Sequence, residues 1–142
     1  MSTESLHTSE SFVTQSTLMR EVMTHAPVTI EASDTIASAR TLMRKLHCRH
    51  LPVVEHRRLV GILSERDVLV FESLLGANAH LDKVGEAMNP YVYTTTVHAK
   101  LRDVARVMAA ERYGSAVVLE NDQIVGIFTA TDAFRHLVAA LR

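Results

Sequence analysis

The sequence predicts a mixed α/β fold of the α+β type, in which two tandem β-α-β-β-α repeats pack sheet to sheet with pseudo-twofold symmetry. The first observation is an internal duplication: VGILSERD at 60–67 recurs as VGIFTATD at 125–132. The second is that both copies show the same order of expected strands and helices. The third is size, because a unit this small buries too little surface to stand alone and needs the other copy as cover.

The first copy begins with a short extended run at 28–30, directly after Pro27. A helix follows, and we expect Ser33 or Asp34 to cap its N-terminus. The apolar residues of this helix recur on one face at helical spacing: Ile36, Ala39, Leu42, Met43 and Leu46.

A hairpin and a second helix complete the first copy. Apolar runs at 51–54 and 59–63 predict two strands, which the charged turn 55–58 joins. Ser64 then stands where a helix cap is expected. The residues after it are acidic, and the helix dipole favours acidic residues in a first turn.

The second copy repeats this order. It has an extended run at 92–95 and a helix that Gly114 is expected to stop. Strands are expected at 116–119 and 124–128, and Thr129 opens the last helix. The apolar face of the first of these helices is formed by Leu101, Val104, Val107 and Met108.

The pattern divides the chain into four segments. We expect a flexible, Ser- and Thr-rich N-terminal arm at 1–16, a first repeat at 17–72, a linker at 73–82 and a second repeat at 83–142. Both repeats are expected to form one composite module.

Length and composition exclude several classes of protein. The chain has 142 residues, of which 47% are hydrophobic and 22% charged, so it can form an ordinary folded domain. A net charge of −1 provides no basic surface for a nucleic acid backbone, and no apolar run is long enough to span a membrane. The single cysteine, Cys48, cannot form an internal disulfide, which fits a reducing compartment. We therefore expect a cytoplasmic protein that binds neither nucleic acid nor membrane.

These patterns resemble the CBS domain pair, the module named after cystathionine β-synthase. Each copy ends in G-apolar-x-[ST]-x-x-D and begins near a methionine, in REVM at 20–23 and GEAM at 85–88. RHLPV at 49–53 is similar to the start of the family's second strand. The resemblance covers nearly all of the chain after the arm.

The resemblance implies a non-catalytic regulatory module that binds an adenosine-containing ligand in the clefts between the repeats. AMP, ADP or ATP is the expected ligand, with S-adenosylmethionine or NAD as further options, and no tightly bound cofactor is expected. It also implies a homodimer formed through helices, and an unknown effector protein on which the module acts in trans. No catalytic motif stands out in the sequence, so no enzyme activity is expected.

Asp67 and Asp132 are the expected ribose ligands, because a carboxylate can accept hydrogen bonds from both vicinal hydroxyls of a ribose. Ser64 and Thr129 stand three residues earlier, where a strand gives way to a helix N-terminus that can meet phosphate oxygens. The remaining expected ligand contacts are Val28, Leu51, Pro52, Tyr93, Ala116 and Val117 as apolar walls, Arg66 and Thr131 at the helix starts, and Arg49, His50 and Ser115 at the strand starts.

The two sites are expected to differ in charge. Arg49-His50 of the first copy aligns with Gly114-Ser115 of the second. The resemblance implies that the basic pair reaches a phosphate held in the site of Asp132, which leaves the Asp67 site with Arg66 and the serine of the second pair.

Two alternatives stay open. The [ST]-x-x-D pattern is also typical of a plain helix cap, and the protein would then be a ligand-independent dimerising interaction module. In the other alternative, His47, Cys48 and His50 form a metal- or redox-responsive site, because soft and borderline ligands cluster there. The adjacent Arg49 and Lys45 repel a cation, and we therefore expect no metal site.

Overall fold

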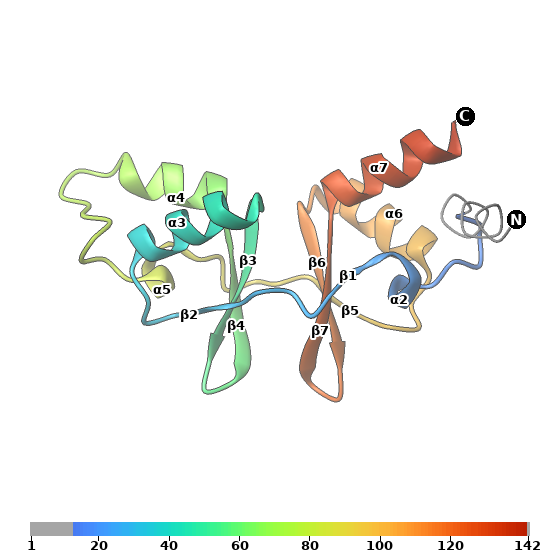
Figure 1. The fold of residues 1–142 in the computed structure, drawn as a ribbon, viewed down its shortest axis with the longest axis horizontal. Coiled ribbons are helices and arrows are strands. Elements are labelled where there is room, and N and C mark those ends of the chain that lie inside the picture. Colours follow the sequence, from blue (N-terminus) through green and yellow to red (C-terminus); the bar gives the residue numbers. More distant parts are fainter. Residues whose placement is uncertain (1–12, 142) are drawn as a thin grey trace, which may run out of the picture.

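The computed structural model describes residues 13–141, which form two lobes placed side by side (Figure 1). The expected arm at 1–16 lies outside the described residues except for 13–16, and Arg142 lies outside them as well. Each lobe has a sheet on its inner side and helices on its outer side, so that the two sheets face one another at the centre of the molecule. The predicted α+β fold of two sheets with helices is confirmed.

The first lobe contains a three-stranded sheet of order β2-β3-β4, in which β2 is parallel to β3 and β4 is antiparallel to it. Its strands are β2 (Ile30–Glu31), β3 (His50–Glu55) and β4 (Arg58–Ser64). Its helices are α3 (Ile36–Leu46), α4 (Glu65–Glu72) and α5 (Val84–Ala87).

The second lobe has a four-stranded sheet of order β1-β7-β6-β5, with β1 antiparallel to β7 at its edge. Its strands are β1 (Thr24–His25), β5 (Thr94–Thr96), β6 (Ser115–Glu120) and β7 (Gln123–Thr129). Its helices are α2 (Met19–Val22), α6 (Leu101–Glu111) and α7 (Ala130–Ala140). Among the described residues, none of these helices has the length and apolarity needed to cross a bilayer.

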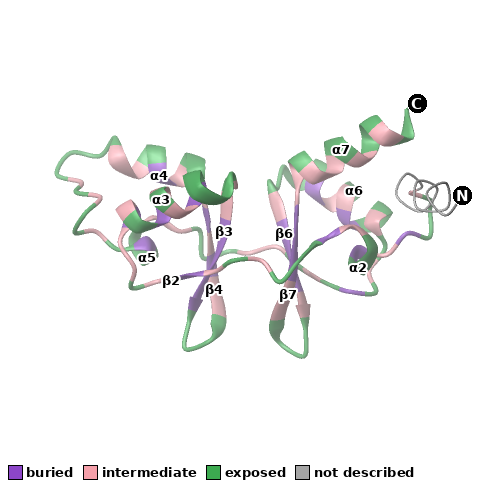
Figure 2. Ribbon diagram, viewed as in Figure 1, coloured by how far each residue is buried: buried purple, intermediate pink, exposed green. Residues whose placement is uncertain are grey.

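Each lobe has its own hydrophobic core between its sheet and its helices (Figure 2). Ile36 and Met43 of α3 are buried in the first core, and Val104 and Met108 of α6 are buried in the second. Leu46 lies at the end of the predicted apolar face but is exposed. The 3.6-residue apolar spacing therefore located the inner face of α3 and α6.

Both hairpins close through two residues with positive φ, as tight two-residue turns require. In the first hairpin these are His56 and Arg57, with φ of 51° and 65°. In the second they are Asn121 and Asp122, with φ of 53° and 62°. The two predicted turns are confirmed, although only in the second do both residues belong to the types that adopt this backbone conformation readily.

Three sequence-based expectations about element ends are wrong. Helix α3 is capped by Thr35, whose hydroxyl accepts the Ser38 N–H at 3.2 Å, and not by Ser33 or Asp34. The Asp34 carboxylate instead accepts the Glu31 N–H at 3.1 Å and closes the loop before the helix.

Gly114 does not provide the left-handed stop expected for α6, because Arg112 adopts that conformation with φ of 60°. The two leading extended runs form strands shorter than predicted and displaced toward the C-terminus. These strands are Ile30–Glu31 and Thr94–Thr96.

The leading segments of the two sequence repeats are exchanged between the lobes. Strand β1 precedes the first repeat's helices in sequence but pairs with β7, and Met19 of α2 is buried in the second core. Reciprocally, Val84 of α5 is buried in the first core. Each lobe is therefore completed by the segment that leads into the other repeat.

The exchange explains the glycine in both VGI sequences. A Cβ on Gly61 would collide with the Met88 side chain and lie 3.1 Å from the Asn89 carbonyl oxygen. A Cβ on Gly126 would collide with Met23 in the same manner. In each lobe, the methionine of the exchanged segment thus lies directly against a glycine of the hairpin's second strand, which is β4 in one lobe and β7 in the other.

We expect Gly61→Ala to destabilise the protein by about 1–3 kcal/mol, because the added methyl group overpacks the contact with Met88. Urea unfolding measures this change. Gly85→Ala is the matched control, since its Cβ would meet only ordinary contacts with Ala32. A Gly61→Ala variant as stable as the wild type contradicts the packing role of this contact.

Candidate functional site

Two clefts lie where the sheets give way to α4 and α7. We name them the Asp67 cleft and the Asp132 cleft, after the acidic residue in the first turn of each helix. Their volumes are about 440 and 540 Å³, respectively. Both volumes fall in the range of clefts that hold small-molecule ligands.

The acidic residue of each cleft is fixed by a capping box. The Asp67 Oδ2 atom accepts the Ser64 N–H at 2.9 Å, and the Asp67 N–H donates to the Ser64 hydroxyl at 3.0 Å. Thr129 and Asp132 form the same pair of bonds, at 2.9 and 3.2 Å. The predicted caps at Ser64 and Thr129 are confirmed.

The capping box does not use up the carboxylates. A carboxylate has two oxygens and about four lone-pair positions, of which the cap occupies one. In Asp132 the second oxygen, Oδ1, lies 3.5 Å from the exposed Arg135 guanidinium. The caps therefore hold each carboxylate in a fixed orientation and leave acceptor positions for another molecule.

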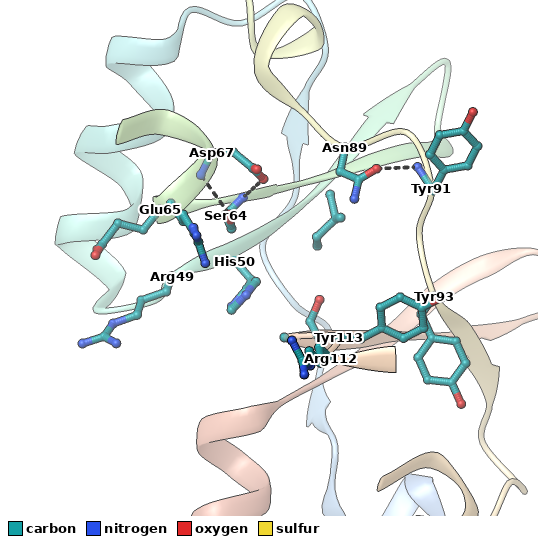
Figure 3. Close-up of a pocket in the computed structure, with 14 residues that line it drawn as sticks. Arg49, His50, Ser64, Glu65, Asp67, Asn89, Tyr91, Tyr93, Arg112 and Tyr113 are labelled. Atoms are coloured by element: carbon teal, nitrogen blue, oxygen red, sulfur yellow. Dashed lines mark hydrogen bonds between the residues drawn. The ribbon is translucent and has the colours of Figure 1, made fainter. Parts of the chain in front are cut away.

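The Asp67 cleft is polar and aromatic (Figure 3). The rings of Tyr93 and Tyr113 stack with centroids 5.2 Å apart, and burial raises the pKa of Tyr93. Asn89 holds the nearby loop by accepting the Tyr91 N–H at 3.0 Å. The residues that line this cleft are Arg49, His50, Ile62, Ser64, Glu65, Arg66, Asp67, Asn89, Tyr91, Tyr93, Arg112, Tyr113, Gly114 and Ser115.

The Asp132 cleft is more aliphatic on the side formed by the segment after β1. Val28 from that segment and Leu51 from β3 line it together with Ile127 from β7. The full lining is Thr24, Ala26, Pro27, Val28, Leu46, His47, Cys48, Arg49, His50, Leu51, Ile127, Thr129, Thr131, Asp132 and Arg135.

The structure distributes the predicted ligand contacts between the two clefts. Ser64, Arg66, Asp67, Tyr93 and Ser115 line the Asp67 cleft, and Val28, Leu51, Thr129, Thr131 and Asp132 line the Asp132 cleft. Pro52, Ala116 and Val117 have buried side chains and line neither cleft.

The positive charge is shared between the clefts, and the expected contact of Arg49 and His50 with a phosphate at Asp132 stays a prediction. Arg49 and His50 line both clefts rather than the Asp132 cleft alone. Arg112, which the sequence reading missed, adds a further cation to the Asp67 cleft. The duplication contained the signal for Arg112, because this residue aligns with His47 of the first repeat, and both occupy the left-handed C-cap of a helix.

His50 lies between the lobes. Its side chain points toward Arg112 and Tyr113, whereas Arg49 points outward (Figure 3). A Cβ on Gly114 would lie 2.8 Å from the His50 Nε2 atom, so a larger residue here would displace the ring. The glycine thus lets the His50 ring lie directly against the opposite lobe.

The local environment lowers the pKa of His50. Burial is the largest cause, and Arg49 acts in the same direction. Asp67 and Asp132 both oppose this shift, which shows that the carboxylates of the two clefts act on one imidazole. The imidazole is therefore neutral at neutral pH.

The metal and redox alternative finds little geometric support. Within residues 13–141, no three His, Cys, Asp or Glu side chains gather closely enough to hold a metal ion. Cys48 is partly exposed in the Asp132 cleft, and burial raises the pKa of its thiol. A raised pKa lowers the thiolate fraction on which cysteine reactivity depends.

The comparisons with known proteins identify the fold. The family model described as CBS domain matches residues 19–73 and 84–139. The chain belongs to the CBS domain family. The two matched segments coincide with the duplicated halves of the sequence, so the protein contains a CBS domain pair.

Individual relatives have the same architecture. Hypoxic response protein 1 of Mycobacterium tuberculosis is 25% identical over 122 residues, which are 85% of each chain. A crystal structure of a Vibrio cholerae protein assigned to acetoin utilization (AcuB) is 30% identical with a TM-score of 0.79, and covers 87% of this chain and 92% of that one.

The CBS domain pair of protein MJ0100 was crystallised in complex with 5′-methylthioadenosine and S-adenosyl-L-methionine. It is 25% identical with a TM-score of 0.78, and the match covers 89% of this chain and 98% of that one. A CBS pair of similar sequence and fold therefore binds adenosine-containing molecules.

His50 makes the stability of this CBS pair depend on pH. The folded pKa of His50 lies below the unfolded value of about 6.5, so the unfolded chain takes up the proton first as the pH falls. The contribution of His50 to the free energy of unfolding is fully present above the unfolded pKa and is lost as the pH falls below it. We expect His50→Gln to reduce the loss of stability between pH 7.5 and 5.5, measured by urea unfolding.

The matched control for this prediction is His47→Gln, which removes a histidine exposed at the end of α3. This variant is expected to keep the wild-type pH profile. A His50→Gln variant whose stability falls as steeply as that of the wild type contradicts the prediction.

Proposed function

We propose that this CBS domain pair is a non-catalytic regulatory module that binds adenosine-containing ligands in its two clefts. AMP, ADP and ATP are the leading ligands, and S-adenosylmethionine and NAD are further candidates. Bound ligand shifts the packing of the lobes, and a partner protein detects this change. The observation that carries the proposal is the pair of oriented carboxylates, Asp67 and Asp132, one in each cleft.

The chemistry of each cleft matches the parts of a nucleotide. The free acceptor positions of Asp67 and Asp132 suit the vicinal hydroxyls of a ribose. The start of α4 or α7 and the nearby Arg49 suit phosphate oxygens, because helix N-termini and guanidinium groups both attract anions. Apolar or aromatic walls in each cleft suit the faces of an adenine ring.

The adenosine-type ligand is supported by the bound molecules of the MJ0100 CBS pair. The nucleotide class is further supported by the cations in both clefts, since a phosphate group carries more negative charge than the single carboxylate of S-adenosylmethionine, whose sulfonium is itself a cation. Phosphate-bearing ligands are therefore the better fit for this chain.

We expect AMP at about 100 times the dissociation constant of a cleft to stabilise the wild type by roughly 2.7 kcal/mol for that cleft in thermal unfolding. Asp67→Ala and Asp132→Ala are each expected to reduce this ligand-induced gain, because each removes the ribose acceptor of one cleft. ADP, ATP, S-adenosylmethionine and NAD are compared in the same assay.

Each alanine variant also loses a capping box, so the ligand-induced shift is measured against the same variant without ligand. Asp34→Ala is the matched control, because Asp34 accepts a backbone N–H three residues away but lies outside both clefts. No shift of the wild type with any adenosine compound would overturn the proposed function.

A second function, dimerisation, is favoured by the exposed outer faces of α4 and α7 (Figure 2). Helix α7 has no buried residue although its sequence is strongly amphipathic. Exposed apolar faces of this kind mark protein–protein contacts. The exposed side chains are Leu69 and Val70 on α4, Phe134, Leu137 and Val138 on α7, and Leu141 at the C-cap of α7.

We propose that a second copy of this chain covers these helices and forms a homodimer. Leu137→Glu is expected to shift the protein from dimer to monomer in light scattering coupled to size exclusion, because it places a charge in the apolar face. Leu81→Glu is the control, since Leu81 is an even more exposed leucine (70% against 51% for Leu137) in the segment between α4 and α5. A wild type that is monomeric at high concentration contradicts the proposal.

A further inference from the structure

The two clefts share part of their wall. Arg49 and His50 contribute to both, and they are the only residues that do so in the described part of the chain. The aligned residues of the second repeat, Gly114 and Ser115, offer no second imidazole or guanidinium. The two clefts are therefore related by the repeat of the backbone, but Arg49 and His50 have no basic counterparts in the second repeat.

His50 is the member of this pair that lies between the clefts. Its ring rests against Gly114, which belongs to the opposite lobe, while Arg49 is exposed and directed outward. Both Asp67 and Asp132 act electrostatically on His50. A ligand in either cleft therefore meets the same imidazole.

A neutral imidazole has one N–H donor and one acceptor nitrogen. Burial keeps His50 neutral near pH 7.5, so it can donate a hydrogen bond to the phosphate of only one ligand at a time. The other cations line single clefts: Arg66 and Arg112 in one, and Arg135 in the other. Each of these arginines can therefore contribute to phosphate affinity in one cleft only.

We propose that His50 couples the two clefts, so that the first phosphate-bearing nucleotide lowers the affinity for the second. An uncharged nucleoside does not compete for this donor and fills both clefts independently. This inference rests on the proposed function. It adds that the module distinguishes a phosphorylated adenosine ligand from adenosine itself by the number of molecules it holds at moderate concentration.

The test is isothermal titration calorimetry with AMP at pH 7.5. Asp67→Ala leaves the Asp132 cleft, and Asp132→Ala leaves the Asp67 cleft, so each variant gives the AMP dissociation constant of one cleft alone. For independent clefts, the product of the two wild-type dissociation constants equals the product of the two single-cleft values. We expect the wild-type product to be about fivefold or more larger, the smallest effect typical of coupled sites.

The coupling ratio is the product of the two dissociation constants of the two-cleft protein divided by the product of the two single-cleft values. The same set of titrations in a His50→Gln background is expected to give a coupling ratio close to one. His47→Gln is the matched control, because His47 lines only the Asp132 cleft, and it is expected to keep the wild-type ratio. Adenosine in place of AMP is expected to give a ratio close to one in all of these proteins.

The outcomes separate the inference from the proposed function. Binding of AMP in both clefts with a wild-type ratio near one, or a ratio that persists in His50→Gln, overturns the coupling and leaves the proposed function standing. Failure of the wild type to bind either AMP or adenosine overturns both.

Discussion

The exchange of the two leading segments holds the molecule together. Met23 crosses Gly126 of the second lobe, and Met88 crosses Gly61 of the first, so each lobe depends on a segment that continues into the other. Gly61 and Gly126 lie on β4 and β7, the two strands that end at the helix caps Ser64 and Thr129. The same methionine–glycine contacts therefore help to position the strands from which the two clefts begin.

The residues that we propose for recognition at the starts of α4 and α7 also cap their helices. Ser64 and Asp67 satisfy each other's backbone N–H groups, which is the ordinary task of a capping box. That task also fixes the direction of the carboxylate, so the proposed binding role requires no reorganisation of Asp67 or Asp132. The capping and ligand-binding interpretations of the motif are therefore compatible rather than exclusive.

The sequence was sufficient for the fold because its duplication and its apolar spacing are local signals. The caps at Ser64 and Thr129 followed from the same local pattern. Contacts between the lobes were not accessible in this way. The contact between Gly114 and His50 depends on how the two sheets meet. Residue spacing within one repeat does not predict such a contact. The alignment of Arg112 with His47 was visible in the duplication, but the place of Arg112 in the Asp67 cleft depends on the same meeting of the lobes.

The exchanged segments have a consequence for the origin of the pair. Met19 and Val84 occupy aligned positions in the two repeats. Met19 lies at the start of the first repeat but is buried in the core of the second lobe, and Val84 lies at the start of the second repeat but is buried in the core of the first lobe. Two copies of one ancestral repeat could have completed each other in the same reciprocal way as separate chains. Joining them adds no new contact and only raises the effective concentration of each half near the other. Once joined, the halves were free to diverge, and the single histidine at the seam is a mark of that divergence.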